Sequence, residues 1–252
     1  MPAERFANFA AGLRLDAVPI EVLAHAKLCL IDAAGIALAS PTFDFAHRAA
    51  SAVVMLAGPE IGPAGVPVIG MGLSLPVRDA ILMNGTLVHG LDFDDTHSGS
   101  VVHATASAFP VAFAHALVRG ASGAEMLAAY LVAVETDARI GRLAGGQWQK
   151  RGHHPTGMIA AYGAALAAGR LLGLSEGQLV RAQGIVHSMA SGNLEFLTDG
   201  DWTKRLHPGW AGVCGTTAAA FAGSGFLGPR RPYEGRYGVY NLHLGADAGV
   251  DA

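Results

Sequence analysis

The sequence predicts an all-α fold, a compact domain of many helices, and three observations support this prediction. Ala- and Leu-rich segments with helical spacing follow one another along the chain. Short connections rich in Gly, Pro and Ser separate them. Almost no stretch shows the apolar–polar alternation of a half-buried strand. With 252 residues, 51% of them hydrophobic, the chain can bury a large core.

In the first ninety residues, apolar residues recur at helical spacing. This pattern predicts four helices, over residues 3–13, 19–39, 43–57 and 76–90. Only GVPVIGMG, residues 65–72, favours a short extended piece. Gly90 suits the left-handed conformation that ends many helices, so we expect the fourth helix to stop there.

The remainder predicts five more helices, over residues 107–118, 123–144, 155–173, 176–190 and 208–223. Ser122 with Glu125, and Ser175 with Gln178, have the spacing of a capping box, which marks two of the starts. Many Ala and Gly residues favour closely packed helices. We expect one helical domain over residues 1–228 and a loop-rich tail over 229–252, where Gly, Pro and Tyr are dense.

Composition and charge argue against several classes of function. The net charge is −3 and no Lys/Arg run stands out, so we expect no nucleic-acid partner. Mean hydropathy is +0.35, but Gly, His, Asp or Arg is expected to break each apolar run too early for a membrane span, so we expect no membrane partner. The start of the chain lacks a secretory signal pattern, which predicts a cytoplasmic protein. Cys29 and Cys214 lie in apolar contexts and predict unpaired thiols.

The stretch HGLDFDDTHSGSVVHATA, residues 89–106, concentrates polar side chains in a chain with only 15% charged residues. Its polar side chains, expected on a loop, include Asp92, Asp94, Asp95, Thr96, His97 and His103. Three interpretations stay open: capping of turns, binding of a divalent ion, and acid/base catalysis. A metal site would need a second carboxylate cluster. The motif DFDD also suggests a Mg²⁺-dependent prenyl-diphosphate enzyme. Such an enzyme needs two Asp-rich clusters, and the only second candidate, TDGD at 198–201, is a poor match, so this hypothesis is less favoured.

Two further motifs, KRGHHPTGM at 150–158 and DWTKRLHPGWAG at 201–212, each contain His-Pro. Proline suits the first position of a helix, so His154 and His207 are predicted to be N-caps. Helix N-termini attract anions, and basic side chains stand close by in both motifs, namely Lys150, Arg151, Lys204 and Arg205. This pattern favours a small anionic molecule as ligand.

Together LDFDDTH…H, GHHPTG and TKRLHPGWA, in this order and spacing, resemble the MmgE/PrpD family, which includes 2-methylcitrate dehydratase, cis-aconitate decarboxylase and iminodisuccinate epimerase. The resemblance implies a helical domain that a smaller α+β lid completes in longer members, a homodimer, and no metal or organic cofactor. Here the lid domain is expected to be missing. A separate lid-containing chain is then a further expected partner.

The resemblance assigns active-site positions to Asp92, Thr96, His103, His154 and Lys204. We hypothesise that the two histidines move protons and that Lys204 holds a substrate carboxylate. Asp92 is expected to orient a histidine and Thr96 to bond the substrate. Arg151, Arg205 and His207 are predicted to bind substrate.

The resulting functional hypothesis is a cofactor-independent lyase that acts on a small di- or tricarboxylate through proton transfer next to a carboxylate. A dehydratase of the 2-methylcitrate type and a decarboxylase of the cis-aconitate type fit equally well. One alternative is an epimerase of an imino-dicarboxylate such as iminodisuccinate. Another is a truncated, non-catalytic helical domain that serves in dimerisation.

Overall fold

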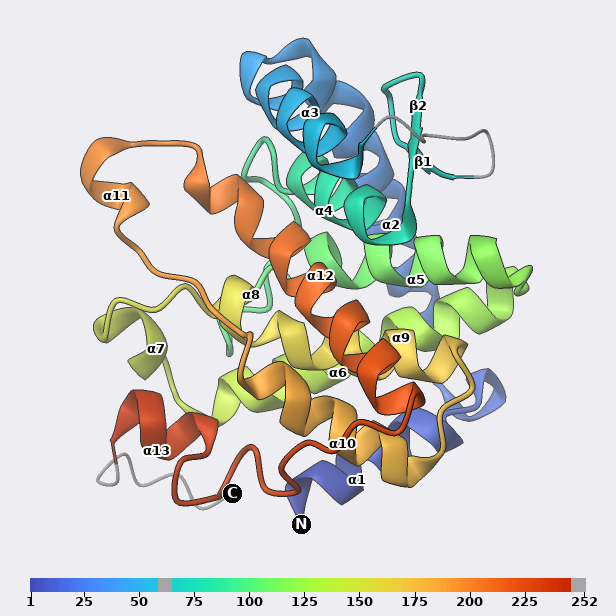
Figure 1. Cartoon of the computed structure of the whole chain (residues 1–252), viewed down its shortest axis with the longest axis vertical. Helices are drawn as coiled ribbons and strands as arrows, with labels where there is room; N and C mark the ends of the chain where they lie inside the picture. The colour runs from blue at the N-terminus through green and yellow to red at the C-terminus, as the bar shows by residue number, and fades with distance from the viewer. Residues whose placement is uncertain (59–64, 246–252) are drawn as a thin grey trace.

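The computed structural model describes residues 1–58 and 65–245, which are mostly helical (Figure 1). The first elements are α1 (Pro2–Gly12), α2 (Ile20–Ala39), α3 (Asp44–Ala57), β1 (Val66–Val68), β2 (Leu73–Leu75) and α4 (Val77–Val88). They are followed by α5 (Thr105–Arg119), α6 (Gly123–Leu143), α7 (Gln147–Lys150), α8 (Pro155–Met158), α9 (Ala160–Leu171), α10 (Glu176–His187), α11 (Phe196–Asp199), α12 (Thr203–Gly223) and α13 (Val239–Leu244). The all-α prediction is confirmed.

Both predicted capping boxes are present. The Ser122 hydroxyl accepts a hydrogen bond from the Glu125 amide, and Ser175 does the same for Gln178. The predicted helix over 155–173 divides at Ile159 into α8 and α9. The extended piece at 65–72 is half of a hairpin, because β1 pairs antiparallel with β2.

α12 begins at Thr203, five residues before its predicted start, so the prediction of His207 as an N-cap is wrong. Trp202 is the N-cap of α12, and the side chain of Asp201, one residue before it, accepts a hydrogen bond from the Thr203 amide at 2.7 Å. The helix then continues through Pro208, which costs it one backbone hydrogen bond. His207 therefore lies inside the helix and is buried.

The predicted end of α4 near Gly90 is confirmed, but the left-handed conformation expected of Gly90 is wrong. α4 ends at Val88, and Gly90 is not among the residues with positive φ. Glycine is needed here for space, since a Cβ on Gly90 would lie 2.4 Å from Phe45 and 2.5 Å from Ser40. The segment after α4 thereby packs tightly against the start of α3.

Small residues let α12 approach its neighbours closely, as the Ala/Gly content predicts. A Cβ on Gly85 of α4 would lie 2.5 Å from Gly209 of α12, and one on Gly215 would lie 2.5 Å from Ala164 of α9. The helices therefore meet backbone to backbone. This contact fixes the first turns of α12 beside the end of α4, where the polar stretch begins.

The tail predicted from residue 229 is described up to residue 245 and packs onto the helices. Tyr233 and Tyr240 are buried; their hydroxyls donate to the Gln183 side chain at 2.8 Å and to the Ile140 carbonyl at 3.0 Å. The tail also contains the short helix α13. The last part of the predicted tail, 246–252, lies outside the described residues.

α2 differs from the other long helices because much of its apolar surface is exposed. By length and composition, residues Ile20–Thr42 could cross a membrane, with a mean hydropathy of 1.7. The expectation that polar residues break every such run is therefore wrong for this helix, which keeps Lys27 and Asp32 within it. Cys29 and Cys214 are both unpaired, as predicted; Cys214 is buried and Cys29 is half-buried.

Candidate active site

Three segments that are distant in the sequence meet at the start of α12. They are the end of α4 with His89 and the loop 90–104 that follows it, the residue before α8, and the first turns of α12. Gly157 of α8 makes the last contact possible, because a Cβ there would lie 3.2 Å from the Cβ of His207. Four histidine rings adjoin one another: the ring centroids of His89 and His103 are 4.6 Å apart, those of His89 and His154 6.1 Å, and those of His154 and His207 4.9 Å.

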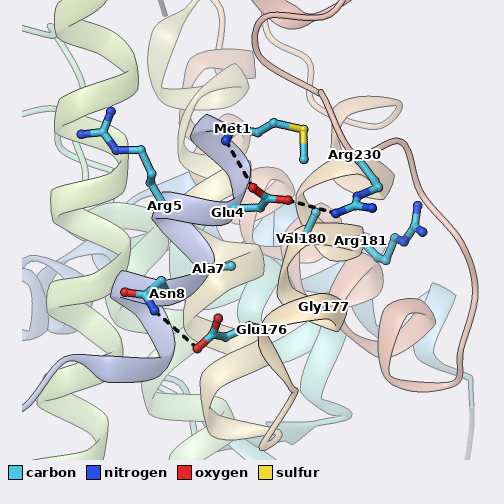
Figure 2. Close-up of a pocket in the computed structure, with 10 residues that line it drawn as sticks. All are labelled: Met1, Glu4, Arg5, Ala7, Asn8, Glu176, Gly177, Val180, Arg181 and Arg230. Atoms are coloured by element: carbon cyan, nitrogen blue, oxygen red, sulfur yellow. Dashed lines mark hydrogen bonds and ion pairs between the residues drawn. The ribbon is translucent and has the colours of Figure 1, made fainter.

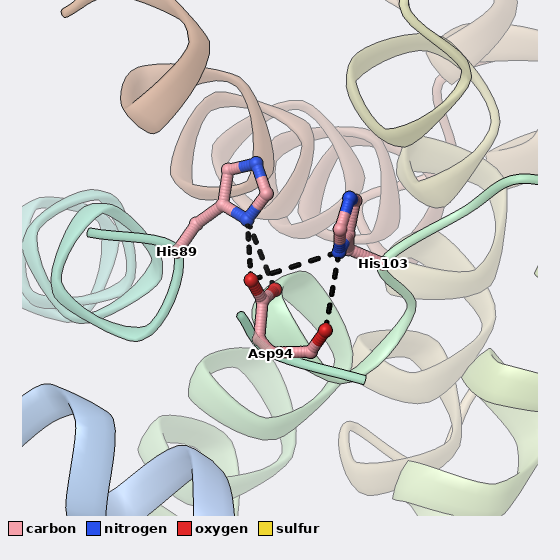
Figure 3. Close-up of side chains that lie close together, drawn as sticks. All are labelled: His89, Asp94 and His103. Atoms are coloured by element: carbon pink, nitrogen blue, oxygen red, sulfur yellow. Dashed lines mark hydrogen bonds and ion pairs between the residues drawn. The ribbon is translucent and has the colours of Figure 1, made fainter. Parts of the chain in front are cut away.

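A buried carboxylate, Asp94, holds two of these rings (Figure 3). His89 Nδ1 lies 2.9 Å from both oxygens of Asp94, and His103 Nδ1 lies 3.4 Å from the Asp94 carbonyl and 3.6 Å from its Oδ1. Since carboxylates and carbonyls only accept, Nδ1 carries the proton in each ring. The remaining nitrogen, Nε2, then has a free lone pair, and in Figure 3 both Nε2 atoms point away from Asp94.

His154 and His207 form a second pair, with their Nδ1 atoms 2.7 Å apart. One Nδ1 donates and the other accepts, so the two rings share one proton at this contact. One ring consequently presents a basic Nε2 and the other an Nε2–H donor. The pair can therefore act as both acid and base. His154 is the N-cap of α8 as predicted, but its side chain makes no capping hydrogen bond and turns to His207 instead.

Burial favours the neutral form of three of these imidazoles, those of His103, His154 and His207. It lowers the pKa of His154 to about 2, with further contributions from His207, His89 and Lys204. It lowers the pKa of His207 to about 4 and also that of His103, although Asp94 opposes the shift for His103. At neutral pH the site thus contains uncharged bases beside cationic Lys204.

Lys204 and Asp92 form an ion pair at the rim of this histidine cluster. Burial raises the pKa of Asp92, but the hydrogen bond and charge of Lys204 outweigh it, so the net pKa lies below its ordinary value. Thr96 contacts His103, with its Oγ1 3.2 Å from Nδ1. All five positions assigned by the resemblance thus lie in or beside one cluster.

The loop that carries Asp92 and Thr96 is strained at two points. Asp92 has φ 60° and Val101 has φ 53°, the only positive values at non-glycine residues in the part of the chain described. Such a conformation is rare for a β-branched residue and costs about 1–3 kcal/mol. Bonds from His97 to the backbone of Ser100, Val101 and Val102 hold the loop in this shape.

The three predicted substrate-binding residues lie in different surroundings. His207 is part of the cluster. Arg205 donates to the Gly90 carbonyl at 2.8 Å and stacks 5.0 Å from the ring centre of Phe45, so it anchors the loop to α12. Arg151 is exposed, and its guanidinium lies towards Gly245 of the tail. No contact in the described ranges brings Arg151 to the histidines.

His89 and Asp94 are functional candidates that the sequence analysis did not assign. His89 follows an apolar helical run and resembles a residue of the helix interior, and Asp94 is one of three aspartates on the loop. A usable signal is that a histidine at a helix end and an aspartate five positions later can meet across a turn. His89, Asp94 and His103 could also hold a cation, since one ligand atom from each lies within 4.8 Å of the others. The present hydrogen bonds account for the same geometry without one.

A groove of about 890 Å³ between α1 and α10 offers a different chemistry (Figure 2). Most of its charged groups already have partners: Glu4 binds the amino terminus and Arg230, Glu176 accepts from Asn8, and Arg181 donates to the Gly228 carbonyl. No histidine lines it. The histidine cluster is therefore the better candidate for catalysis.

Comparison with known families identifies the kind of protein that carries this cluster. The model of the MmgE/PrpD N-terminal domain matches residues 4–249. The chain belongs to the MmgE/PrpD family. This family member is 28% identical over 242 residues to the cis-aconitate decarboxylase-like protein oryM of Aspergillus oryzae, covering 92% of the chain and 49% of that protein.

Two further relatives have the same relation to this MmgE/PrpD chain. Cis-aconitate decarboxylase of Aspergillus terreus is 27% identical over 92% of the chain and 48% of the relative. Cis-aconitate decarboxylase of Homo sapiens is 30% identical over 90% of the chain and 47% of the relative. The chain thus spans about half the length of the curated relatives it matches.

Proposed function

We propose that this MmgE/PrpD domain carries the acid/base groups of a lyase that decarboxylates a small unsaturated tricarboxylate of the cis-aconitate type. The observation that carries the proposal is the cluster of neutral imidazoles beside an ammonium group, around the predicted positions His103, His154 and Lys204. The activity for which the relatives are named supports the choice of decarboxylation among the reactions of the family.

Each charged or basic group has a role in this reaction. Lys204 leaves Asp92 and binds a carboxylate that stays on the substrate. The bond to the departing carboxylate then breaks, CO₂ leaves, and the electron pair moves onto the carbon skeleton, conjugated with a remaining carboxylate. His103 takes up a proton from solvent on Nε2, the nitrogen with the free lone pair, and then delivers this proton to carbon. His103 suits this role because Asp94 and Thr96 surround its Nδ1 and stabilise the charged ring when it forms.

We also propose that these steps require neither a metal ion nor an organic cofactor. Substrate binding and turnover are separate readouts of this proposal.

The test is to incubate the purified chain, treated with EDTA, with cis-aconitate, 2-methylcitrate and iminodisuccinate in D₂O. We expect CO₂ and a deuterated unsaturated dicarboxylate from cis-aconitate alone, followed by NMR. Histidine ring signals should shift on binding even where turnover is slow. Water loss from 2-methylcitrate or deuterium exchange into iminodisuccinate would favour the dehydratase or the epimerase, and no binding at all would favour a non-catalytic domain.

A further inference from the structure

We propose that a groove between α1, α6 and the tail binds a small molecule with an aromatic ring and an anionic group, and that this molecule restrains loop residues 97–102. The groove has a volume of about 690 Å³, the size of a small-molecule site. We call it the α1–α6 groove. Its lining includes Arg5, Phe9, His97, Arg139, Arg142 and Tyr233.

Part of the α1–α6 groove is aromatic. Phe6 of α1 lies against Tyr233 of the tail, with ring centroids 5.4 Å apart, and Tyr233 is almost fully buried. Phe9 also lines the groove, but its ring has no aromatic partner among the described residues. Aromatic rings prefer tilted or offset contacts with centroids about 4.5–7 Å apart. An aromatic ligand beside Phe9 would supply such a contact.

The groove also has an excess of positive charge, in a chain of net charge −3. The described residues that line it carry three guanidinium groups and one carboxylate, and Arg139 is bonded to this carboxylate, Glu135, at 2.6 Å. Arg5 and Arg142 have no ion pair and no side-chain hydrogen bond in the part of the chain described. In Figure 2 the Arg5 guanidinium points away from Glu4. A guanidinium binds a carboxylate or a phosphate through parallel hydrogen bonds, so an anionic group suits this site.

The groove adjoins the loop of the candidate active site. His97 lines it, and the His97 carbonyl accepts a hydrogen bond of 2.8 Å from the amide of Val101, the residue with φ 53°. Arg142 packs against the same loop, because a Cβ on Gly99 would lie 3.2 Å from Arg142 Cγ. A ligand that contacts the side chains of both His97 and Arg142 would therefore restrain the loop directly after Thr96.

The experiment titrates the purified chain with two probes and follows its amide NMR signals. Naphthoate carries a carboxylate and AMP a phosphate, so the pair distinguishes the two sources of the anion. We expect saturable binding of at least one probe at millimolar concentration. Naphthalenemethanol, which lacks the charge, and cyclohexanecarboxylate, which lacks the aromatic ring, should bind at least about fivefold more weakly. Exchange of the Val101 amide hydrogen with solvent should slow about threefold when the probe is bound.

Substitutions locate the binding site. Arg142→Gln should weaken binding about tenfold, because a charge-assisted hydrogen bond is lost. Arg48→Gln is the matched control, since Arg48 is also exposed and loses the same charge but lies on α3, outside the groove. Lys204→Gln should leave the affinity unchanged, which separates the groove from the histidine cluster. Phe9→Leu should weaken naphthoate about threefold. Circular dichroism of each variant shows that the helices remain folded.

Several results would overturn the proposal. They are the absence of saturable binding for both probes, equal weakening by Arg142→Gln and Arg48→Gln, and loss of binding in Lys204→Gln. An unchanged exchange rate at Val101 with a probe bound would overturn the link to the loop. These measurements do not use turnover, so they are independent of the proposed decarboxylation.

Discussion

The described residues contain two groups of neighbouring histidines, one mostly buried and one half-buried, and only the mostly buried group has the properties of an active site. In the site cluster, His154 and His207 face each other, and Nε2 of His89 is buried without a hydrogen-bond partner among the described residues. In the second group, near the tail, the rings are used for structure. His187 contacts the Tyr162 hydroxyl and the Tyr237 carbonyl, each at 2.8 Å, and His153 packs against His243 at 4.9 Å.

A lowered pKa does not distinguish the two groups. Burial lowers the pKa of His243 to about 4, aided by His153 and His187, and it lowers the pKa of His153 as well. The shift at His243 is comparable to that at His207. What separates the groups is the set of neighbours: the site cluster adjoins a buried carboxylate and an ammonium group, and its Nε2 atoms stay available. A lowered histidine pKa therefore shows only that the ring is removed from water. Acid/base catalysis also requires free ring nitrogens with charged groups, here a carboxylate and an ammonium group, beside them.

The adjacent histidines 153 and 154 give the largest expected contrast. His154→Ala removes a base of the site cluster and should lower kcat/KM for cis-aconitate by about 10²- to 10⁴-fold. His153→Ala, one residue away, removes contacts with Trp148 and with His243 of the tail, and should leave kcat/KM within about threefold. Steady-state kinetics of both variants checks this. Equal losses would erase the distinction between the two groups.

Asp94→Asn should have the next largest effect. The amide keeps the shape of the side chain but cannot stabilise a charged His103, so we expect kcat to fall about 100-fold with a smaller change in KM. The pH profile of kcat provides the second readout, since the proton on His103 should be lost at lower pH in the variant. An unchanged profile would show that Asp94 acts only in folding.

Lys204 and Arg205 are neighbours with different expected roles. Lys204→Gln should raise KM for cis-aconitate about tenfold, because a substrate carboxylate loses its cation. Arg205→Gln should act on stability instead, with a loss of about 1 kcal/mol as the bond to the Gly90 carbonyl and the contact with Phe45 disappear. Kinetics and urea unfolding of both variants measure the two effects. A raised KM for Arg205→Gln alone would reverse the assignment.

Acid should destabilise the domain through His207. Its pKa is about 4 in the folded state and about 6.5 when unfolded, so the unfolded chain binds the proton more readily between these values. Stability therefore falls as pH drops through 6.5 and levels off below about 4. His207→Asn should remove on the order of 2 kcal/mol of this pH dependence. Urea unfolding from pH 7 to pH 4 measures it, and parallel curves for both proteins would contradict the assignment.

Much of the fold was predictable because its signals are local. Capping boxes at Ser122 and Ser175 depend on side chains three residues apart, and helical spacing is a property of short windows. The start of α12 was missed because the rule for proline placed a helix start at Pro208, while the helix begins at Thr203, after the N-cap Trp202. The end of α4 was predicted to within two residues, but the reason given for Gly90 was wrong, because the contact with Phe45 requires a glycine there and its φ does not.

The sequence by itself determined the helical class, the unpaired cysteines and a set of acid, base and cationic residue types in three motifs, since composition and short-range spacing encode these. Tertiary structure alone decided which of them meet. Close contacts at Gly85, Gly157 and Gly209 place α12 against α4 and α8, which pairs His154 with His207 and leaves Arg151 outside. The physical reason is that proton transfer and charge stabilisation depend on distances of a few ångströms between residues that are far apart along the chain.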